Sequence, residues 1–172
     1  VKFSYSWLCD HLETDKNATE IGDALTNLGL ELESFTDYSS YSEFVVATIK
    51  DFHKHPNADR LNICTVDDGT KTYQVICGAN NVKKGLKGIF AKDGMYIPGT
   101  QIYLKKGKIR GEISEGMLLS ERELNLSDDH DGIIELSDSF ENGTSAIDAL
   151  KLNDPVFEIG ITPNRGDCLG VR

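Results

Sequence analysis

The sequence predicts a β-rich α+β fold, in which a short helical region is followed by many short strands. Three observations support this: a helix-capping pattern near residue 17, short segments of alternating apolar and polar residues, and glycine-containing turns between them. The 172 residues are enough for one ordinary domain, or for a compact module with a smaller companion. Frequent short strands separated by glycine turns favour a small barrel or a sandwich.

The first forty residues contain the clearest helix. Asn17 and Glu20 have the spacing of a capping box, apolar residues follow at helical spacing, and Gly29 suits the left-handed position that ends a helix. The alternation over residues 30–35 then predicts a short half-buried strand. The polar stretch at 37–42 predicts a domain boundary.

After this boundary the pattern changes to strands. The segments that predict strands are 44–52, 61–66, 73–77, 88–92, 101–104, 133–136 and 156–161. A second capping-box pattern, from Ser120 to Glu123, predicts one short helix. Four widely separated cysteines with no close pair predict reduced, mostly buried thiols.

Charge is sorted along the chain, although the net charge is −10. Residues 1–43 hold 2 basic and 9 acidic residues, and residues 119–172 hold 4 and 12, whereas residues 44–118 hold 12 and 7. This asymmetry indicates a polyanion-binding centre between acidic flanks, or else a solvated lysine-rich surface. No eighteen apolar residues run together and the chain does not begin with a signal-peptide core, so we expect no membrane partner and a cytoplasmic location.

Two loops are candidates for ligand contact. The segment 55–61 is rigidified by Pro56, and is either a structural turn or a rim that presents His55 and Arg60. The segment 111–117 is a glycine-containing bend, in which Ser114 and Met117 either contact RNA or, for Met117, fill the core.

No catalytic or metal site is expected. Residues 127–132 superficially resemble a calcium loop, but Ser127 and Asp138 fall at the first and last ligand positions, where Asp and Glu are expected. None of the four Cys or four His residues has an oriented catalytic partner nearby in the sequence.

Several strings together resemble the N-terminal part of the bacterial phenylalanine–tRNA ligase beta subunit family. They occur in the family's order at residues 3–8, 28–33, 55–61, 76–82, 114–117, 120–124 with 127–132, and 161–169.

The resemblance implies a fold and a domain division. It implies a five-stranded OB-fold barrel that binds tRNA, at residues 41–150, inserted into a small α+β domain made from both chain ends. Residues 1–40 form the first part of that domain and 151–172 its truncated return segment, so we expect the chain to be a piece of a longer protein.

The resemblance also implies partners and cofactors. The intact enzyme is an α₂β₂ tetramer with an alpha subunit, and it joins phenylalanine to its tRNA using ATP and magnesium. Both the joining reaction and proofreading belong to other parts, so this chain is expected to be non-catalytic. The alternative is a structural, subunit-organising module with weak RNA affinity.

Within the barrel, OB folds bind ligands through two loops, and the loop at 53–60 matches the first of these by position. We expect the basic stretch around Lys105–Arg110 to approach the second. We expect basic side chains to converge there on phosphates, while Tyr96 and Tyr103 either stack on unpaired bases or, as we favour, fill the barrel core. The candidate contacts are Arg60, Lys83, Lys84, Lys87, Lys105, Lys106, Lys108, Arg110, Ser114 and Met117.

Overall fold

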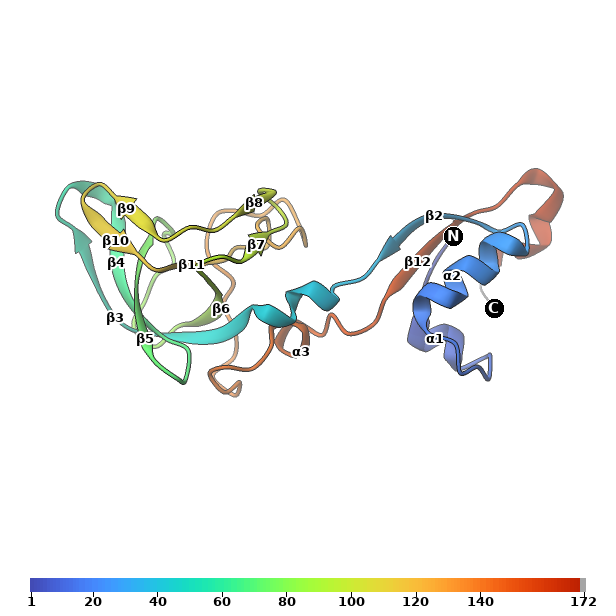
Figure 1. The fold of residues 1–172 in the computed structure, drawn as a ribbon, viewed down its shortest axis with the longest axis horizontal. Coiled ribbons are helices and arrows are strands. Elements are labelled where there is room, and N and C mark those ends of the chain that lie inside the picture. The colour runs from blue at the N-terminus through green and yellow to red at the C-terminus, as the bar shows by residue number, and fades with distance from the viewer. Residues whose placement is uncertain (171–172) are drawn as a thin grey trace. The chain divides into compact units, whose positions relative to one another are not determined.

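The computed structural model describes residues 1–170, which divide into two compact units (Figure 1). Unit 1 contains residues 1–40 and the chain from residue 151 onward, and unit 2 contains Tyr41–Leu150. Among the described residues, no helix is both long and apolar enough to span a bilayer.

Unit 1 is a small antiparallel sheet with the strand order β1-β12-β2. Strand β12 comes from the end of the chain and lies between two strands from its beginning, so both chain ends build one sheet. Phe157 on β12 is fully buried, and its ring centroid lies 5.3 Å from that of Phe3 and 5.2 Å from that of Phe35. The elements are β1 (Lys2–Ser4), α1 (Tyr5–Cys9), α2 (Ala18–Asn27), β2 (Glu31–Thr36), β12 (Val156–Gly160) and η2 (Pro163–Leu169).

The capping box predicted for α2 is confirmed. The Asn17 side chain accepts from the backbone N–H of Glu20 at 3.0 Å, and the Glu20 carboxylate accepts from the N–H of Asn17 at 2.8 Å. Gly29 adopts φ +84°, as expected just after a helix end. The helix packs closely on the sheet, because a Cβ on Gly22 would lie 3.0 Å from Leu32.

Unit 2 is built on an antiparallel sheet with the order β11-β6-β3-β4-β5. The two edge strands approach each other, because the N–H of Glu115 donates to the carbonyl of Gln74 at 2.8 Å. The sheet is therefore a nearly closed barrel of the OB kind, as the sequence predicts. The elements are η1 (Ser39–Glu43), β3 (Val45–His55), β4 (Ala58–Asp67), β5 (Thr72–Cys77), β6 (Lys87–Lys92), β7 (Tyr96–Ile97), β8 (Ile102–Tyr103), β9 (Gly107–Ile109), β10 (Glu112–Ser114), β11 (Gly116–Leu118) and α3 (Ala146–Leu150).

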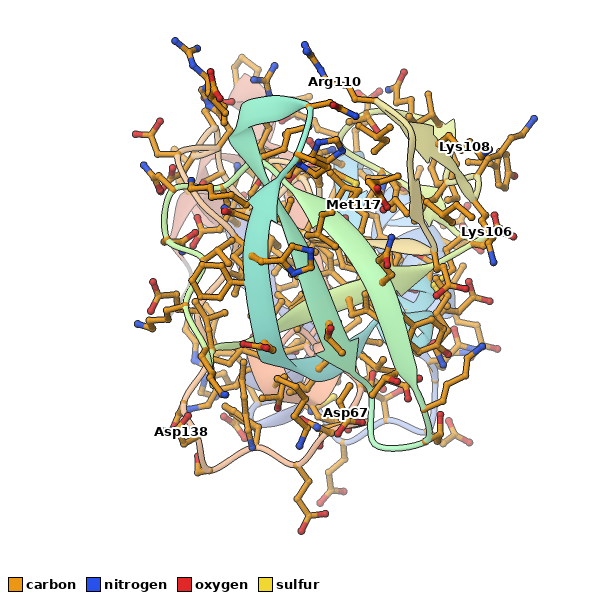
Figure 2. The ribbon with its side chains drawn as sticks, turned by 90° about the vertical axis from the view of Figure 1, so that its left-hand side faces the viewer. Asp67, Lys106, Lys108, Arg110, Met117 and Asp138 are labelled. Carbon is orange, nitrogen blue, oxygen red and sulfur yellow. The ribbon has the colours of Figure 1, made fainter. Side chains whose placement is uncertain are left out.

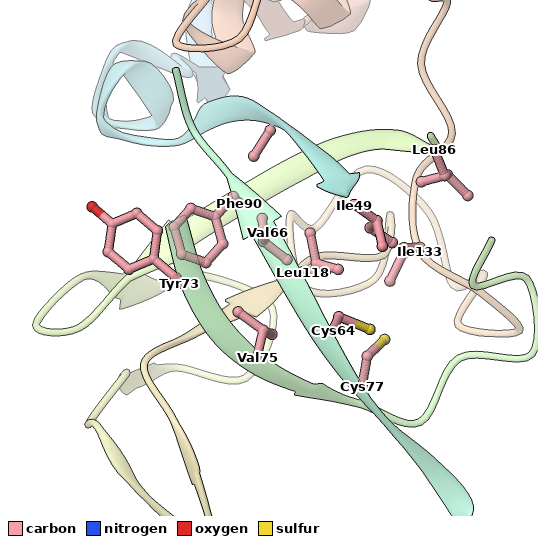
Figure 3. Packing of buried hydrophobic residues seen from close by; sticks show 11 residues of the cluster. Ile49, Cys64, Val66, Tyr73, Val75, Cys77, Leu86, Phe90, Leu118 and Ile133 are labelled. Atoms are coloured by element: carbon pink, nitrogen blue, oxygen red, sulfur yellow. The ribbon is translucent and has the colours of Figure 1, made fainter. Parts of the chain in front are cut away.

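Alternate residues of the strands fill the barrel (Figure 3). Phe90 lies at the centre with no exposed surface, 4.9 Å from Tyr73 between ring centroids. Cys64 and Cys77 are buried in the same cluster, and burial raises the pKa of Cys64 to about 12. Both are reduced thiols as expected, whereas Cys9 is exposed.

The helix predicted after Ser120 does not form, and the segment is a series of turns. The N–H and the hydroxyl of Ser120 both donate to the Glu123 carboxylate, which is one half of a capping box. The return bond, from the N–H of Glu123 to the Ser120 hydroxyl, is not among the hydrogen bonds of the described residues. Asn125 then adopts φ +58°, which no α-helix continues through.

The strand predicted at 133–136 is also wrong, apart from an isolated bridge between Lys87 and Leu136. The side chain of Asn81 replaces the neighbouring strand. Its Oδ1 accepts from the N–H of Ile133 at 3.0 Å, and its Nδ2 donates to the Ile133 carbonyl at 2.8 Å.

A buried carboxylate holds the β4–β5 turn to β6. The Asp68 side chain has 1% exposed surface and lies 2.7 Å from Lys92 Nζ. Burial alone would raise the pKa of Asp68, but hydrogen bonds from Lys92, from the amide of Lys71 and from Thr70 outweigh it and hold that pKa well below its usual range.

We expect Asp68→Asn to lower the free energy of unfolding at neutral pH by about 1–3 kcal/mol, because it removes a charged hydrogen bond. Since the folded-state pKa is depressed, the stabilisation is complete above about pH 4 and is lost as the pH falls toward the folded value. Urea unfolding at several pH values measures this. The matched control is Asp59→Asn, at an exposed position of the same barrel. Equal loss in both variants, or the same acid dependence in D68N as in the parent, would contradict the assignment.

Candidate nucleic-acid interface

The buried ring of His55 fixes the β3–β4 loop to the β9–β10 hairpin. Its Nδ1 accepts from the backbone N–H of Asn57 at 3.0 Å, and its Nε2 lies 3.0 Å from the carbonyl oxygen of Ile109. An amide can only donate and a carbonyl can only accept, so the ring hydrogen of this bridge is on Nε2. With 4% of its surface exposed, His55 is a structural bridge rather than a side chain presented to a ligand.

The tip of the β9–β10 hairpin is a tight turn that presents Arg110. Arg110 and Gly111 adopt φ 51° and 100°, as required at both central positions of a type I′ turn. The side-chain amide of Asn57 donates to the Arg110 carbonyl at 3.3 Å, which holds the turn from the opposite loop. The two loops that OB folds use for binding are thus joined to each other, and the Arg110 side chain extends from their junction (Figure 2).

Most predicted cations on this side are open to a ligand. Four of these cations have no carboxylate of residues 1–170 close enough to form an ion pair, and all four are exposed: Arg60, Lys105, Lys108 and Arg110. Lys106 lies beside them but pairs with Glu115 at 2.8 Å, and this contact lowers the pKa of Glu115. We call these five cations the basic edge.

The other predicted lysines form a separate group and are engaged within the chain. Lys83 Nζ lies 2.8 Å from Glu135, and Lys84 Nζ lies 3.9 Å from Asp51. Together with Lys87, these lysines line a hollow of about 510 Å³ that also contains acidic side chains. An RNA phosphate would have to compete with those carboxylates for the lysines.

Lys87 is held most firmly of the three, because its ammonium donates to the carbonyl oxygens of Asp138 and Phe140. Figure 2 shows Asp138 at the lower end of unit 2 and Arg110 at the upper end. The convergence expected from the sequence is therefore only partial, since the predicted cations lie in two groups.

Ser114 and Met117 are placed by the closure of the barrel. The Ser114 hydroxyl accepts from the N–H of Ile76 at 3.1 Å and donates to the Gly116 carbonyl at 2.9 Å, so both of its roles are used internally. Gly116 lets β11 pair closely with β6, because a Cβ there would overlap the ring of Phe90. Met117 is half-buried, between the core and the surface.

A groove of about 210 Å³ lies beside the basic edge. The groove is lined by Ile76 and Met117 of the barrel strands, by Ile109 of the β9–β10 hairpin, and by Leu104, which follows β8. Lys105 and Lys108 line the same groove, which therefore combines apolar surface with positive charge. This combination suits an unpaired nucleotide, whose base is flat and apolar and whose phosphate is anionic.

The core role favoured for the two tyrosines is wrong. Tyr96 and Tyr103 have 43% and 67% of their surface exposed. The signal in the sequence was the two-residue alternation of a strand, because the buried Ile97 places its neighbour Tyr96 on the opposite face.

Replacing His55 by Leu removes the contacts that join the two loops. Loss of one hydrogen bond lowers the free energy of local opening by about 1 kcal/mol. We therefore expect the backbone amide hydrogens of residues 107–114 to exchange with solvent about fivefold faster or more. Hydrogen exchange followed by mass spectrometry measures this, with His53→Leu as an exposed control on the same strand. Unchanged exchange in residues 107–114 of H55L would show that His55 does not hold the hairpin.

Comparison with known proteins identifies the domain and its relatives. The profile described as "Putative tRNA binding domain" matches residues 44–145. The beta subunits of phenylalanine–tRNA ligase from Brucella abortus and Mesorhizobium japonicum are 49% and 51% identical to this chain, over 100% and 99% of it. This chain spans only 22% of the length of either relative.

Among solved structures, a protein related to MetRS from Pyrococcus horikoshii is 23% identical, with a TM-score of 0.43. That alignment covers 60% of this chain and 87% of the other. The assignment rests instead on the matched profile, which covers more than half of the chain and spans the whole barrel sheet. The chain belongs to the tRNA-binding domain family.

Proposed function

We propose that unit 2 binds tRNA through the basic edge, in which Arg60, Lys105, Lys108 and Arg110 meet phosphates. One observation carries this proposal: these cations have no carboxylate partner within residues 1–170, and two of them, Lys108 and Arg110, sit on the hairpin that His55 contacts. A preorganised group of open cations needs little rearrangement to meet a polyanion.

The acidity of the whole chain does not oppose this. At physiological ionic strength the Debye length is about 8 Å, so a phosphate responds mainly to charges in its immediate surroundings. Asp67 and Asp138 lie at the lower end of unit 2 in Figure 2, away from Lys108 and Arg110. Asp93 and Glu115 are exceptions, because both accept hydrogen bonds from Lys106 at the basic edge. The acids at the lower end can keep the protein soluble and orient it, with the basic edge toward RNA.

Such contacts give affinity with little choice of sequence, because phosphates are the same at every nucleotide. The module would therefore strengthen the hold on tRNA, and selection of the correct tRNA would come from elsewhere. We assign no catalytic residue in this chain.

We infer further that the chain acts as part of a phenylalanine–tRNA ligase beta subunit, which its relatives support. In this proposal the complete enzyme works in the cytoplasm, with an alpha subunit, phenylalanine, ATP and magnesium. In the same proposal magnesium and ATP belong to other parts of the ligase.

A second function, organisation of the large subunit with weak RNA affinity, is favoured by one observation. Lys83, Lys84 and Lys87 are engaged with acceptors of their own chain, so part of the positive charge serves the fold. The two candidates predict different results for charge removal.

Two double variants remove the same charge from the two groups. We expect Lys105→Gln with Lys108→Gln to weaken tRNA binding about tenfold or more at low salt, and to flatten the slope of log K against log salt by about two. Lys83→Gln with Lys84→Gln should leave affinity and slope nearly unchanged. Filter binding across a salt series measures both.

If the two double variants lowered tRNA affinity equally, the proposed interface would be overturned, and only a non-specific electrostatic attraction between the chain and RNA would remain. Absence of salt-dependent tRNA binding by the parent would overturn RNA binding itself. In the complete ligase, deletion of residues 41–150 that left tRNA affinity intact but impaired subunit assembly would support the organising function.

A further inference from the structure

The β7–β8 hairpin carries a pair of aromatic side chains on one face. Tyr96 pairs with Tyr103 across the hairpin, and Ile97 pairs with Ile102 on the other face. Ile97 is completely buried, so the tyrosine face is turned away from the barrel. The tyrosine ring centroids lie 5.2 Å apart with an interplanar angle of 59°.

The hairpin is firmly attached, although its strands are short. The N–H of Leu104 donates to the Met95 carbonyl at 2.7 Å, and the N–H of Gly94 donates back to the Leu104 carbonyl at 2.8 Å. At the turn, the N–H of Gly99 donates to the Glu123 carbonyl at 2.8 Å. Gly99 is packed so closely there that a Cβ would overlap the backbone of residue 122. The two rings are therefore held in place before any ligand arrives.

This aromatic surface is not explained by the fold. Tyr103 is 67% exposed and Tyr96 is 43% exposed, and no hydrogen bond of either phenol occurs within the described part of the chain. Grouped exposed apolar side chains mark binding sites more often than single ones do. The Tyr96–Tyr103 pair is therefore a candidate binding surface.

The charge nearby indicates the partner. Lys105 follows Tyr103 by two residues, has no ion pair within residues 1–170 and lines the groove beside the basic edge. An aromatic face followed by open ammonium groups is complementary to a nucleotide, in which a base is followed by a phosphate. An apolar protein segment would gain nothing from these cations.

We propose that Tyr96 and Tyr103 form a stacking platform for an unpaired base of RNA, next to the phosphates held at the basic edge. This inference rests on the proposed function and deepens it, because it restricts the preferred ligand to single-stranded nucleotides. Duplex RNA keeps its bases stacked internally and offers none to the platform.

The test uses the 172-residue chain with an oligouridine and a blunt RNA duplex as probes. Removing an aromatic ring on which a base stacks lowers the affinity about fivefold or more. We therefore expect Tyr103→Ala to bind oligouridine at least about fivefold more weakly than the parent chain does. Tyr103→Phe should retain the affinity, since it keeps the ring. Ile102→Ala is the matched control, being 56% exposed on the other face of the same hairpin.

The salt slope separates the platform from the basic edge. Y103A removes no phosphate contact, so its slope should equal that of the parent, and its duplex affinity should not change. Equal losses in Y103A and I102A, or oligouridine affinity unchanged in Y103A, would overturn the platform but not the proposed function. If the parent chain bound no RNA, both would fall. If the same substitution, placed in the complete ligase, left RNA binding normal but impaired subunit assembly, the platform would instead be a protein contact.

Discussion

The side chain of His55 joins two loops that are more than fifty residues apart in the chain, and the geometry of the basic edge depends on this contact. Without it, the tip of the β9–β10 hairpin would keep only the 3.3 Å bond from Asn57 to the Arg110 carbonyl, and the remaining bonds lie nearer its base, at Ile113, Ser114 and Glu115. A flexible hairpin could carry the same lysines, but ordering it on RNA would cost conformational entropy and lower the affinity. A buried, uncharged contact thus prepares a charged surface.

The basic edge differs from the group of Lys83, Lys84 and Lys87 in whether each lysine is bonded to acceptors of its own chain, not in the number of lysines. Lys83 and Glu135 neutralise each other locally, and such an exposed pair adds little to stability because water screens it. Lys105 and Lys108 have no such partner in the described chain and retain their full attraction for phosphate. The same residue type thus serves the surface of the fold in one place and a ligand in another.

Glycine placement makes the interface possible. Gly116 lets β11 lie against the ring of Phe90 as it pairs with β6 and brings Met117 to the groove, and Gly111 completes the turn that presents Arg110. Gly99 similarly allows the β7–β8 turn to approach the backbone of Glu123 closely enough to hold the tyrosine pair. At each of these places a side chain would collide or require an unfavourable φ angle.

The sequence alone determined the features that depend on near neighbours or on recurring patterns. The capping box of Asn17 and Glu20, the strand alternation and the charge sorting were all readable, because their partners lie within a few residues. The barrel type and the tRNA-binding family came from ordered strings along the chain.

Tertiary structure decided the rest, because it depends on partners distant in sequence. Only folding brings Glu135 to Lys83, turns His55 inward and leaves Tyr103 exposed. The local pattern at Ser120 predicted a helix, but Tyr41 and Gly99 take the carbonyls of Leu124 and Glu123 that a continuing helix would use. Whether a lysine is open to RNA is therefore set by the carboxylates that the fold places beside it, which no local pattern records.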